Sequence, residues 1–199
     1  MTNATVLIYA KPPRMGLAKT RLAKGLGQTE ARRIAHFTLA RTMRAALSGP
    51  WTTILYAAPD SALSGSLGGI WPPHLIRCSQ GRGGLTERLE HGLSNAAPGP
   101  VLFIGADAPD LTPALLRQAI QSLKRHDGVF GPARDGGFWL FGINKNARTR
   151  SPFGNVRWSG PHAMADVWNN LAAKASVAQL PTLIDIDEAK DWRDWNAAR

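Results

Sequence analysis

Short apolar runs of strand length alternate with longer amphipathic segments along the whole chain. The runs that predict strands are residues 5–10, 52–58, 75–78, 101–105, 128–131, 138–143 and 182–186. The segments that predict helices are residues 29–47, 85–95, 161–171 and 188–197, and a further helix opens at Thr112-Pro113. Strands that alternate with helices are typical of a mostly parallel sheet covered by helices, so we expect an α/β fold.

The apolar runs also indicate where the protein acts. None is long enough to span a bilayer, and no basic leader precedes the run 4–10, so we expect neither a membrane association nor a secretory signal. The single cysteine, Cys78, cannot form an internal disulfide, which favours the cytoplasm.

A length of 199 residues fits one domain that spans residues 1–199.

Basic residues outnumber acidic residues by 24 to 14, and the resulting net charge of +10 favours anionic partners. The basic residues are spread along the chain, and no nucleic-acid-binding motif accompanies them. We therefore expect a basic surface around a cleft for a phosphorylated small molecule, and no nucleic acid. A basic, non-catalytic module that binds nucleic acid or a partner protein is the alternative that the charge leaves open.

The loop after the first predicted strand carries Gly16 among several cations, of which Lys11, Lys19 and Arg21 can neutralise phosphate oxygens. A glycine-containing loop at the carboxyl end of a strand is where α/β proteins bind phosphates. The loop lacks the Gly-Lys-Ser/Thr ending of a Walker A motif. It predicts either contacts to nucleotide phosphates or a simple exposed basic loop.

Four aspartates follow or lie within predicted strands. Asp107 and Asp110 come directly after the run 101–105, and carboxylate oxygens are the ligands that Mg²⁺ prefers together with phosphate. Asp110 also stands just before a helix and can instead assist the helix start. Asp185 and Asp187 alternate with isoleucines, which in a strand places both on one face. There they either complete a metal site or are strand-end acids beside basic residues.

A short turn segment, Asp135-Gly136-Gly137, precedes the predicted strand 138–143. Its glycines let the backbone approach a ligand closely, but they also make a hairpin turn, and the residues by themselves favour the turn. Trp139 and Trp158 stand beside these segments and offer rings on which a base or a sugar can stack.

Taken together, these segments resemble a family of bacterial GT-A-like proteins, the nucleotide-diphospho-sugar and arsenosugar-biosynthesis-type glycosyltransferases. The matching pieces are Lys19–Leu22, Gln80-Gly81, Leu85, Glu87-Arg88, Gly105–Leu111, Gly131–Ala133, Asp135–Phe138, Phe153, Val156, Trp158-Ser159 and Asp185–Asp187. They occur in the family's order over nearly the whole chain. More distantly, the pattern is similar to phospholactate and molybdopterin guanylyltransferases, which share the fold.

The resemblance implies a three-layer α/β/α sandwich of the GT-A type and a metal-dependent transferase with a nucleotide-activated donor. It implies Mg²⁺ or Mn²⁺ on Asp107, with Asp185 or Asp187 as a second contact. The implied catalytic residues are Asp107, Lys19 and Arg21. The implied nucleotide contacts are Lys11, Gly16, Lys19, Arg21, Gln80, Gly81 and Arg88, and the implied acceptor contacts are Asp135, Gly136, Gly137 and Trp158.

Two reactions remain open. With a nucleotide sugar as donor, the diphosphate leaves on transfer to a small-molecule acceptor, and the resemblance favours this case. With a nucleoside triphosphate, an acceptor phosphate attacks the α-phosphorus, and the cation-rich loop suits this case. The chain has Gly84-Leu85-Thr86 where the family commonly has Asp-Leu-Gly, and Trp158-Ser159-Gly160 where Trp-Ser-Thr is common. These departures remove a carboxylate and a hydroxyl near the expected acceptor, so the identity of the acceptor stays open.

Overall fold

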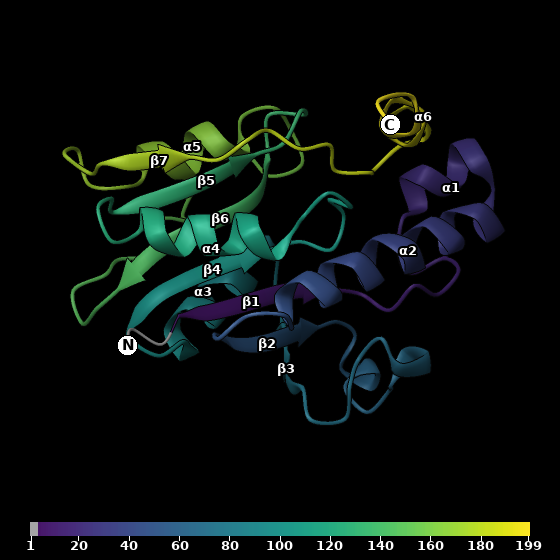
Figure 1. Ribbon diagram of the computed structural model, residues 1–199, viewed down its shortest axis with the longest axis horizontal. Coiled ribbons are helices and arrows are strands. Elements are labelled where there is room, and N and C mark those ends of the chain that lie inside the picture. The colour runs from purple at the N-terminus through teal and green to yellow at the C-terminus, as the bar shows by residue number, and fades with distance from the viewer. Residues whose placement is uncertain (1–3) are drawn as a thin grey trace.

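The computed structural model describes residues 4–199, which form a seven-stranded sheet with helices packed on both of its faces (Figure 1). The strands are β1 (Thr5–Ala10), β2 (Thr52–Ala57), β3 (Ile76–Ser79), β4 (Gly99–Ile104), β5 (Gly128–Pro132), β6 (Phe138–Lys145) and β7 (Val177–Gln179). The helices are α1 (Thr20–Leu26), α2 (Gln28–Ala46), α3 (Leu85–Asn95), α4 (Pro113–Ser122), α5 (Ala163–Asn169) and α6 (Ala189–Ala197), with short 3₁₀ turns η1 (Asp60–Ala62) and η2 (Leu67–Gly69). Every helix within residues 4–199 is too short or too polar to cross a membrane.

The strand order in the sheet is β3-β2-β1-β4-β6-β5-β7. β1 pairs in parallel with β2 on one side and with β4 on the other, and β6 runs antiparallel to both β4 and β5. The direction in which the chain builds the sheet therefore reverses between β1 and β4. In open α/β sheets, ligands bind in the crevice at the carboxyl ends of the strands at such a reversal. The loops that leave β1 and β4 flank this crevice.

The sheet is buried on both faces, as the apolar runs predict. Val6 and Ile8 of β1 pack with α2 and α4, while the intervening Leu7 packs with α3 and α5, and all three side chains are fully buried. Successive side chains of a strand point to opposite faces, so one apolar strand supplies both layers of the core. The predicted three-layer α/β/α sandwich with a mostly parallel sheet is confirmed.

The predicted strand at 182–186 is wrong. Within this segment only Leu183 makes a bridge, to Ala133, and the strand that pairs in parallel with β5 is the earlier β7. Pro181 lies between them and has no N–H to donate, which interrupts the ladder. The chain then crosses the end of the sheet, where the N–H of Ile186 donates to the carbonyl of Asp107 at 2.9 Å. Asp185 and Asp187 thus lie on an irregular crossing segment and not on one face of a strand.

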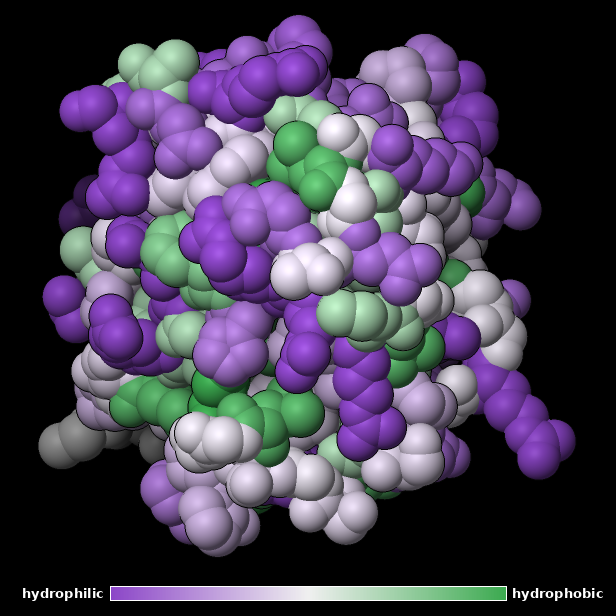
Figure 2. All heavy atoms as spheres, turned by 90° about the vertical axis from the view of Figure 1, so that its right-hand side faces the viewer, coloured by the Kyte–Doolittle hydropathy of each residue, from purple (hydrophilic) through white to green (hydrophobic). Residues whose placement is uncertain are grey.

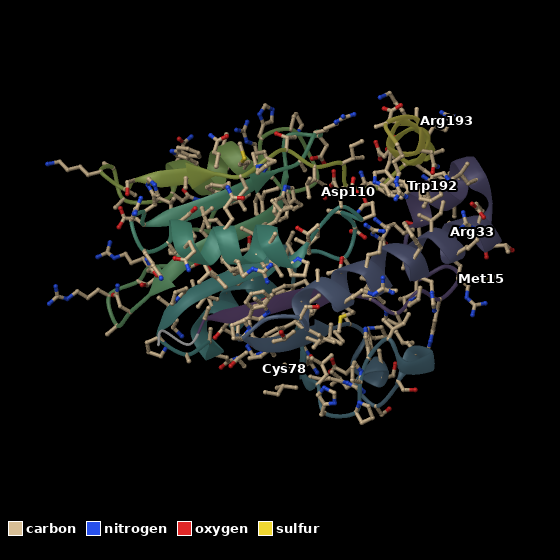
Figure 3. All side chains as sticks on the ribbon, viewed as in Figure 1. Met15, Arg33, Cys78, Asp110, Trp192 and Arg193 are labelled. Atoms are coloured by element: carbon tan, nitrogen blue, oxygen red, sulfur yellow. The ribbon has the colours of Figure 1, made fainter. Side chains whose placement is uncertain are left out.

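Helix α6 is attached to the carboxyl end of the sheet through an apolar cluster that includes Leu22, Ile34, Ile186 and Trp195. The indole N–H of Trp195 donates to Asp110 at 2.7 Å, and Figure 3 shows Asp110 on the loop after β4, beside α6. The start of α4 is capped by the hydroxyl of Thr112, which accepts from the N–H of Leu115. Thr112, and not Asp110, thus caps α4, and Asp110 connects the terminal helix to the loop after β4.

Replacement of Asp110 by alanine is expected to lower the free energy of unfolding by about 1–3 kcal/mol, because a buried indole N–H loses its acceptor. Asp110→Asn keeps an acceptor oxygen and should lose less. Urea unfolding followed by circular dichroism measures both variants. Equal losses in the two would show that the hydrogen bond to Trp195 contributes nothing.

Candidate active site

A cavity of about 410 Å³ opens where the loops leave β1 and β4, and we call it the cationic cavity. The predicted site residues that line it are Lys11, Lys19, Arg21, Gln80, Arg88, Asp107 and Asp187. Figure 2 looks onto this end of the molecule, where hydrophilic side chains surround small apolar patches. Residues from both ends of the chain are thus brought together at the reversal point of the sheet.

Lys19 is the centre of an ion-pair network in this cavity. Its side chain is only 7% exposed, and its Nζ lies 2.6 Å from Oδ1 of Asp107 and 2.9 Å from Oδ1 of Asp187. Arg21 contacts the other oxygen of Asp187 at 2.5 Å. Lys19 also has a left-handed backbone, with φ at 55°, which is uncommon for a residue other than glycine. The loop after β1 therefore adopts an unfavourable conformation that places one ammonium between two carboxylates.

The charges of this network shift the pKa values of Lys19 and Asp187. Burial alone lowers the pKa of the Lys19 ammonium, but the charges of Asp107 and Asp187 raise it above its ordinary value. Burial raises the pKa of Asp187, yet Lys19 and Arg21 together hold it below its ordinary value. The ammonium and the carboxylate accordingly stay ionised.

Asp185 lies in the same neighbourhood, and the ion pairs found within residues 4–199 do not include it. Burial, followed by the negative charges of Asp135, Asp187 and Asp107, raises the pKa of Asp185 to about 7. Negative charge thus gathers around Asp185 at the end of the sheet, although Asp107 and Asp187 are themselves paired with Lys19.

The chemistry of these donors fits a divalent cation in part. Carboxylate oxygens suit Mg²⁺ or Mn²⁺, and the side chain of Asp107 is 43% exposed. Within residues 4–199, however, no three His, Cys, Asp or Glu side chains are grouped so that they can hold a metal ion. The implied set of Asp107, Asp185 and Asp187 is therefore not assembled as one coordination group. Mg²⁺ is commonly held by one or two carboxylates together with substrate phosphates, and Asp107 with Asp187 matches that arrangement.

Gln80 supports the cavity wall. It is 6% exposed, its Nε2 donates to the carbonyls of Tyr56 and Ala10, and its Oε1 accepts from Arg88 at 3.0 Å. Both ends of the amide are engaged by the protein. Gln80 therefore orients the guanidinium of Arg88 toward the cationic cavity.

Two of the implied nucleotide contacts do not line this cavity. Gly16 and Gly81 have φ of 73° and 79°, so each supplies a left-handed turn that disfavours other residues. The N–H of Gly81 donates to the hydroxyl of Ser79. Gly16 and Gly81 therefore shape the loops after β1 and β3.

A second cavity of about 220 Å³ adjoins the first and shares Tyr9, Arg21, Leu85 and Asp187 with it. We call it the aromatic cavity, after the rings of Tyr9, Phe103, Phe138, Trp139 and Trp158 in its lining. Of the implied acceptor contacts, Asp135, Gly137 and Trp158 line it together with Asp185.

Gly136 does not line the aromatic cavity. Its φ is 88°, its carbonyl accepts from the N–H of Met164, and a Cβ here would lie 2.4 Å from the carbonyl oxygen of Pro161. The turn that the sequence favours is present, with Asp135 accepting from the N–H of Gly137 at 2.8 Å. Gly136 thus allows β6 to begin close to the segment before α5.

Sequence reasoning assigned no site role to Tyr9 or Thr86. Tyr9 lines both cavities, and its hydroxyl donates to the carbonyl of Arg88 at 3.1 Å. A tyrosine in an apolar strand is typical of core, so the pattern carried no signal for it. Thr86 lies at one of the family departures, and its hydroxyl accepts from the indole N–H of Trp158 at 2.8 Å while donating to the carbonyl of Phe153. Only the fold shows that Thr86 holds Trp158 in place.

The fold is that of a GT-A-like α/β protein, and solved structures of a nucleotide-sugar transferase and a nucleotidyltransferase share this fold. Residues 39–160, more than half of the chain, match the family described as "Uncharacterized protein conserved in bacteria (DUF2064)", and the chain belongs to that family. No curated protein matches the chain.

Solved structures resemble the chain over nearly its whole length. A proposed nucleotide-diphospho-sugar transferase from Desulfovibrio desulfuricans G20 is 26% identical, with a TM-score of 0.88 over 98% of this chain and 87% of that chain. The 4-diphosphocytidyl-2C-methyl-D-erythritol synthase of Anaerococcus prevotii DSM 20548 is 13% identical, with a TM-score of 0.63 over 99% of this chain and 98% of that chain.

Glucosyl-3-phosphoglycerate synthase of Mycobacterium tuberculosis, in complex with Mn²⁺, UDP and glucosyl-3-phosphoglycerate, is 11% identical. Its TM-score is 0.58 over 97% of this chain and 75% of that chain. At such low identities the last two likenesses show the fold alone.

Proposed function

We propose that this protein is a metal-dependent transferase that uses a nucleotide-activated donor, and that the donor is a nucleotide-diphospho-sugar. The observation that carries the proposal is the pair of adjoining cavities that share Arg21 and Asp187 at the reversal point of the sheet. One cavity is rich in cations and suits the donor phosphates, and the other suits an acceptor. We further propose that the chain from residue 1 to residue 199 forms a single transferase domain.

The cations of the cationic cavity would bind the donor. Lys11, Lys19, Arg21 and Arg88 line it, and an arginine can contact phosphate oxygens in a bidentate way. Arg21 is already held by Asp187, so its guanidinium is oriented before a ligand arrives. Preorganised charges of this kind stabilise charge that develops during transfer.

Asp107 and Asp187 would hold Mg²⁺ or Mn²⁺ together with the donor phosphates. The ion, when bound, supplies positive charge that stabilises a leaving diphosphate. Lys19 bridges the same two carboxylates, so an ion held there would take the position that its ammonium occupies, and the ammonium would become available to the donor phosphates.

In the proposed transfer, a hydroxyl oxygen of the acceptor bonds to the anomeric carbon of the donor sugar. The bond from that carbon to the diphosphate oxygen breaks, and the nucleoside diphosphate leaves from the cationic cavity. The hydroxyl proton passes to Asp135, which lines the aromatic cavity. Arg21, in the lining of both cavities, is placed to neutralise the departing phosphate.

Nucleotidyl transfer from a nucleoside triphosphate is the second candidate. The four cationic side chains of the cationic cavity favour it, because a triphosphate carries more negative charge than a diphosphate ester. A basic, non-catalytic binding module would also use the positive charge of the protein to hold an anionic partner. Such a module would not need the two cavities.

A thermal-shift panel of nucleoside triphosphates, nucleoside diphosphates and nucleotide sugars, each with and without Mg²⁺ or Mn²⁺, tests the proposal. A ligand at about 100 times its Kd adds about 2.7 kcal/mol of stability, so binding gives a clear rise in Tm. We expect a metal-dependent rise with nucleotide sugars.

Lys11→Ala should reduce that rise, and Lys174→Ala, an exposed lysine outside both cavities, should leave it unchanged. A preference for triphosphates would favour nucleotidyl transfer. A panel without any metal-dependent rise would refute the proposal and favour the binding module.

A further inference from the structure

The aromatic cavity differs in charge from the cationic cavity beside it. Its charged lining residues are Asp135, Asp185, Asp187 and Arg21. The guanidinium of Arg21, the one cation among them, already contacts Asp187 at 2.5 Å. The described lining of this cavity therefore offers carboxylates but no cation without a partner.

The polar atoms on its aromatic walls are also engaged. The indole N–H of Trp158 donates to Thr86 at 2.8 Å, and that of Trp139 donates to the carbonyl of Pro181 at 3.2 Å. The hydroxyl of Tyr9 donates to the carbonyl of Arg88. These three side chains thus present ring surface to the cavity, while their donors bind the protein.

Such a lining disfavours a phosphate or a carboxylate. A buried anion needs a cation or several donors. Apart from the side chains already named, the described lining offers one side-chain donor, the hydroxyl of Ser159, and the carboxylates here would repel an anion. Carboxylates accept hydrogen bonds from hydroxyls, and flat apolar rings pack against the C–H face of a ring. A volume of about 220 Å³ lies below the usual range for drug-sized ligands and suits one small ring.

We propose that the aromatic cavity binds an uncharged, polyhydroxylated ring, a sugar or a sugar-like polyol, and excludes phosphorylated acceptors. The inference rests on the proposed function, since it names the acceptor of the same site. Asp135 accepts from the ligand hydroxyls, and Trp158 packs against the ring. An acceptor without phosphate excludes the reaction in which an acceptor phosphate attacks a nucleoside triphosphate, so the cavity selects glycosyl transfer.

Thr86 determines this packing. It stands where the family that the sequence resembles commonly has a glycine. Its hydroxyl accepts a hydrogen bond from the indole N–H of Trp158 and so holds the ring in place. Thr86 is a positioning residue, because it acts on the acceptor through Trp158.

The test compares methyl glucoside, galactoside and mannoside with the matching sugar 6-phosphates by ligand-observed NMR. The cationic cavity is first saturated with the nucleoside diphosphate that stabilises the protein most, together with Mg²⁺, so that phosphates cannot bind there. We expect at least one neutral glycoside to bind at least about tenfold tighter than its 6-phosphate. Tighter or equal binding of the phosphates, or no binding of any glycoside, would overturn the inference.

Variants make the test specific. Asp135→Asn should weaken glycoside binding about fivefold or more, and Thr86→Val should weaken it while Thr86→Ser, which keeps the hydroxyl, does not. Nucleotide affinity, measured by thermal shift on the same proteins, should stay unchanged in all three.

A failure of nucleotide binding in the unmodified protein would instead refute the proposed function, and the glycoside comparison would then be made on the protein alone. Variants that bind glycosides as the unmodified protein does would show that neither Asp135 nor Trp158 contacts the ring.

Discussion

Replacement of Asp107 by asparagine is expected to weaken the metal-dependent part of nucleotide binding by at least about 100-fold. Loss of a residue that merely orients a metal ligand lowers metal affinity about 10- to 100-fold, so loss of Asp107, the proposed ligand itself, should lower it more. Asparagine keeps the shape of the side chain, and the carbonyl of Asp107 that accepts from Ile186 is unaffected. Calorimetric titration of the best nucleotide, at several Mg²⁺ concentrations, measures the effect.

Asp127 provides the matched control for this experiment. It is an exposed aspartate directly before β5, at the opposite end of the sheet, and it accepts a hydrogen bond from Ser176. Asp127→Asn should bind metal and nucleotide as the unmodified protein does. If Asp107→Asn behaved in the same way, Asp107 would not be a metal ligand.

Replacement of Lys19 by methionine is expected to lower the free energy of unfolding in the absence of metal, and added metal is expected to restore part of the loss. Without metal, Asp107 and Asp187 lose the ammonium that lies between them, and the free energy of unfolding should fall by about 2 kcal/mol. This value is below the usual cost of breaking a buried pair, because Asp107 is half-exposed and water screens its charge. With Mg²⁺ or Mn²⁺ added, the ion can take the place of the ammonium and restore part of the stability.

Urea unfolding of Lys19→Met with and without Mn²⁺ measures both effects. Lys24→Met, on the exposed side of α1, controls for the loss of a positive charge in the same region. A loss of stability that metal does not reduce would show that the two carboxylates cannot share an ion. The same variant should also bind the nucleotide more weakly, since Lys19 lines the cationic cavity.

Together these two variants separate the roles of the ammonium and the ion. In the structure, one lysine occupies the position between the carboxylates that an ion would share. If the metal and Lys19 compete for this position, added metal stabilises Lys19→Met more than it stabilises the unmodified protein.

Local sequence patterns determined most of the architecture. The apolar run 101–105 predicted a central strand, and β4 is buried on both faces because no polar side chain interrupts it. Thr112 and Pro113 predicted the start of α4, and the hydroxyl of Thr112 caps it. These features depend on residues close together in the chain, so periodicity and capping chemistry reveal them.

The sequence failed where the chain leaves a regular element. The segment 182–186 alternates like a strand, yet Pro181 interrupts the ladder and the chain crosses the end of the sheet. Helix α1 was not predicted either, since its 7 residues follow directly on the loop after β1 and end at Gly27. In both places contacts with distant parts of the fold decide the backbone.

The candidate site divides in the same way. Residue types and the family resemblance selected Lys19, Asp107 and Asp187 as chemically important, but no local pattern states that one ammonium bridges two carboxylates 88 and 168 positions away. Those contacts follow from the strand order, which places the loop after β1 beside the loop after β4 and beneath the crossing segment. The sequence by itself determined which side chains are candidates for the chemistry. Only the tertiary structure decided which of them meet, because their distances depend on the packing of the whole sheet.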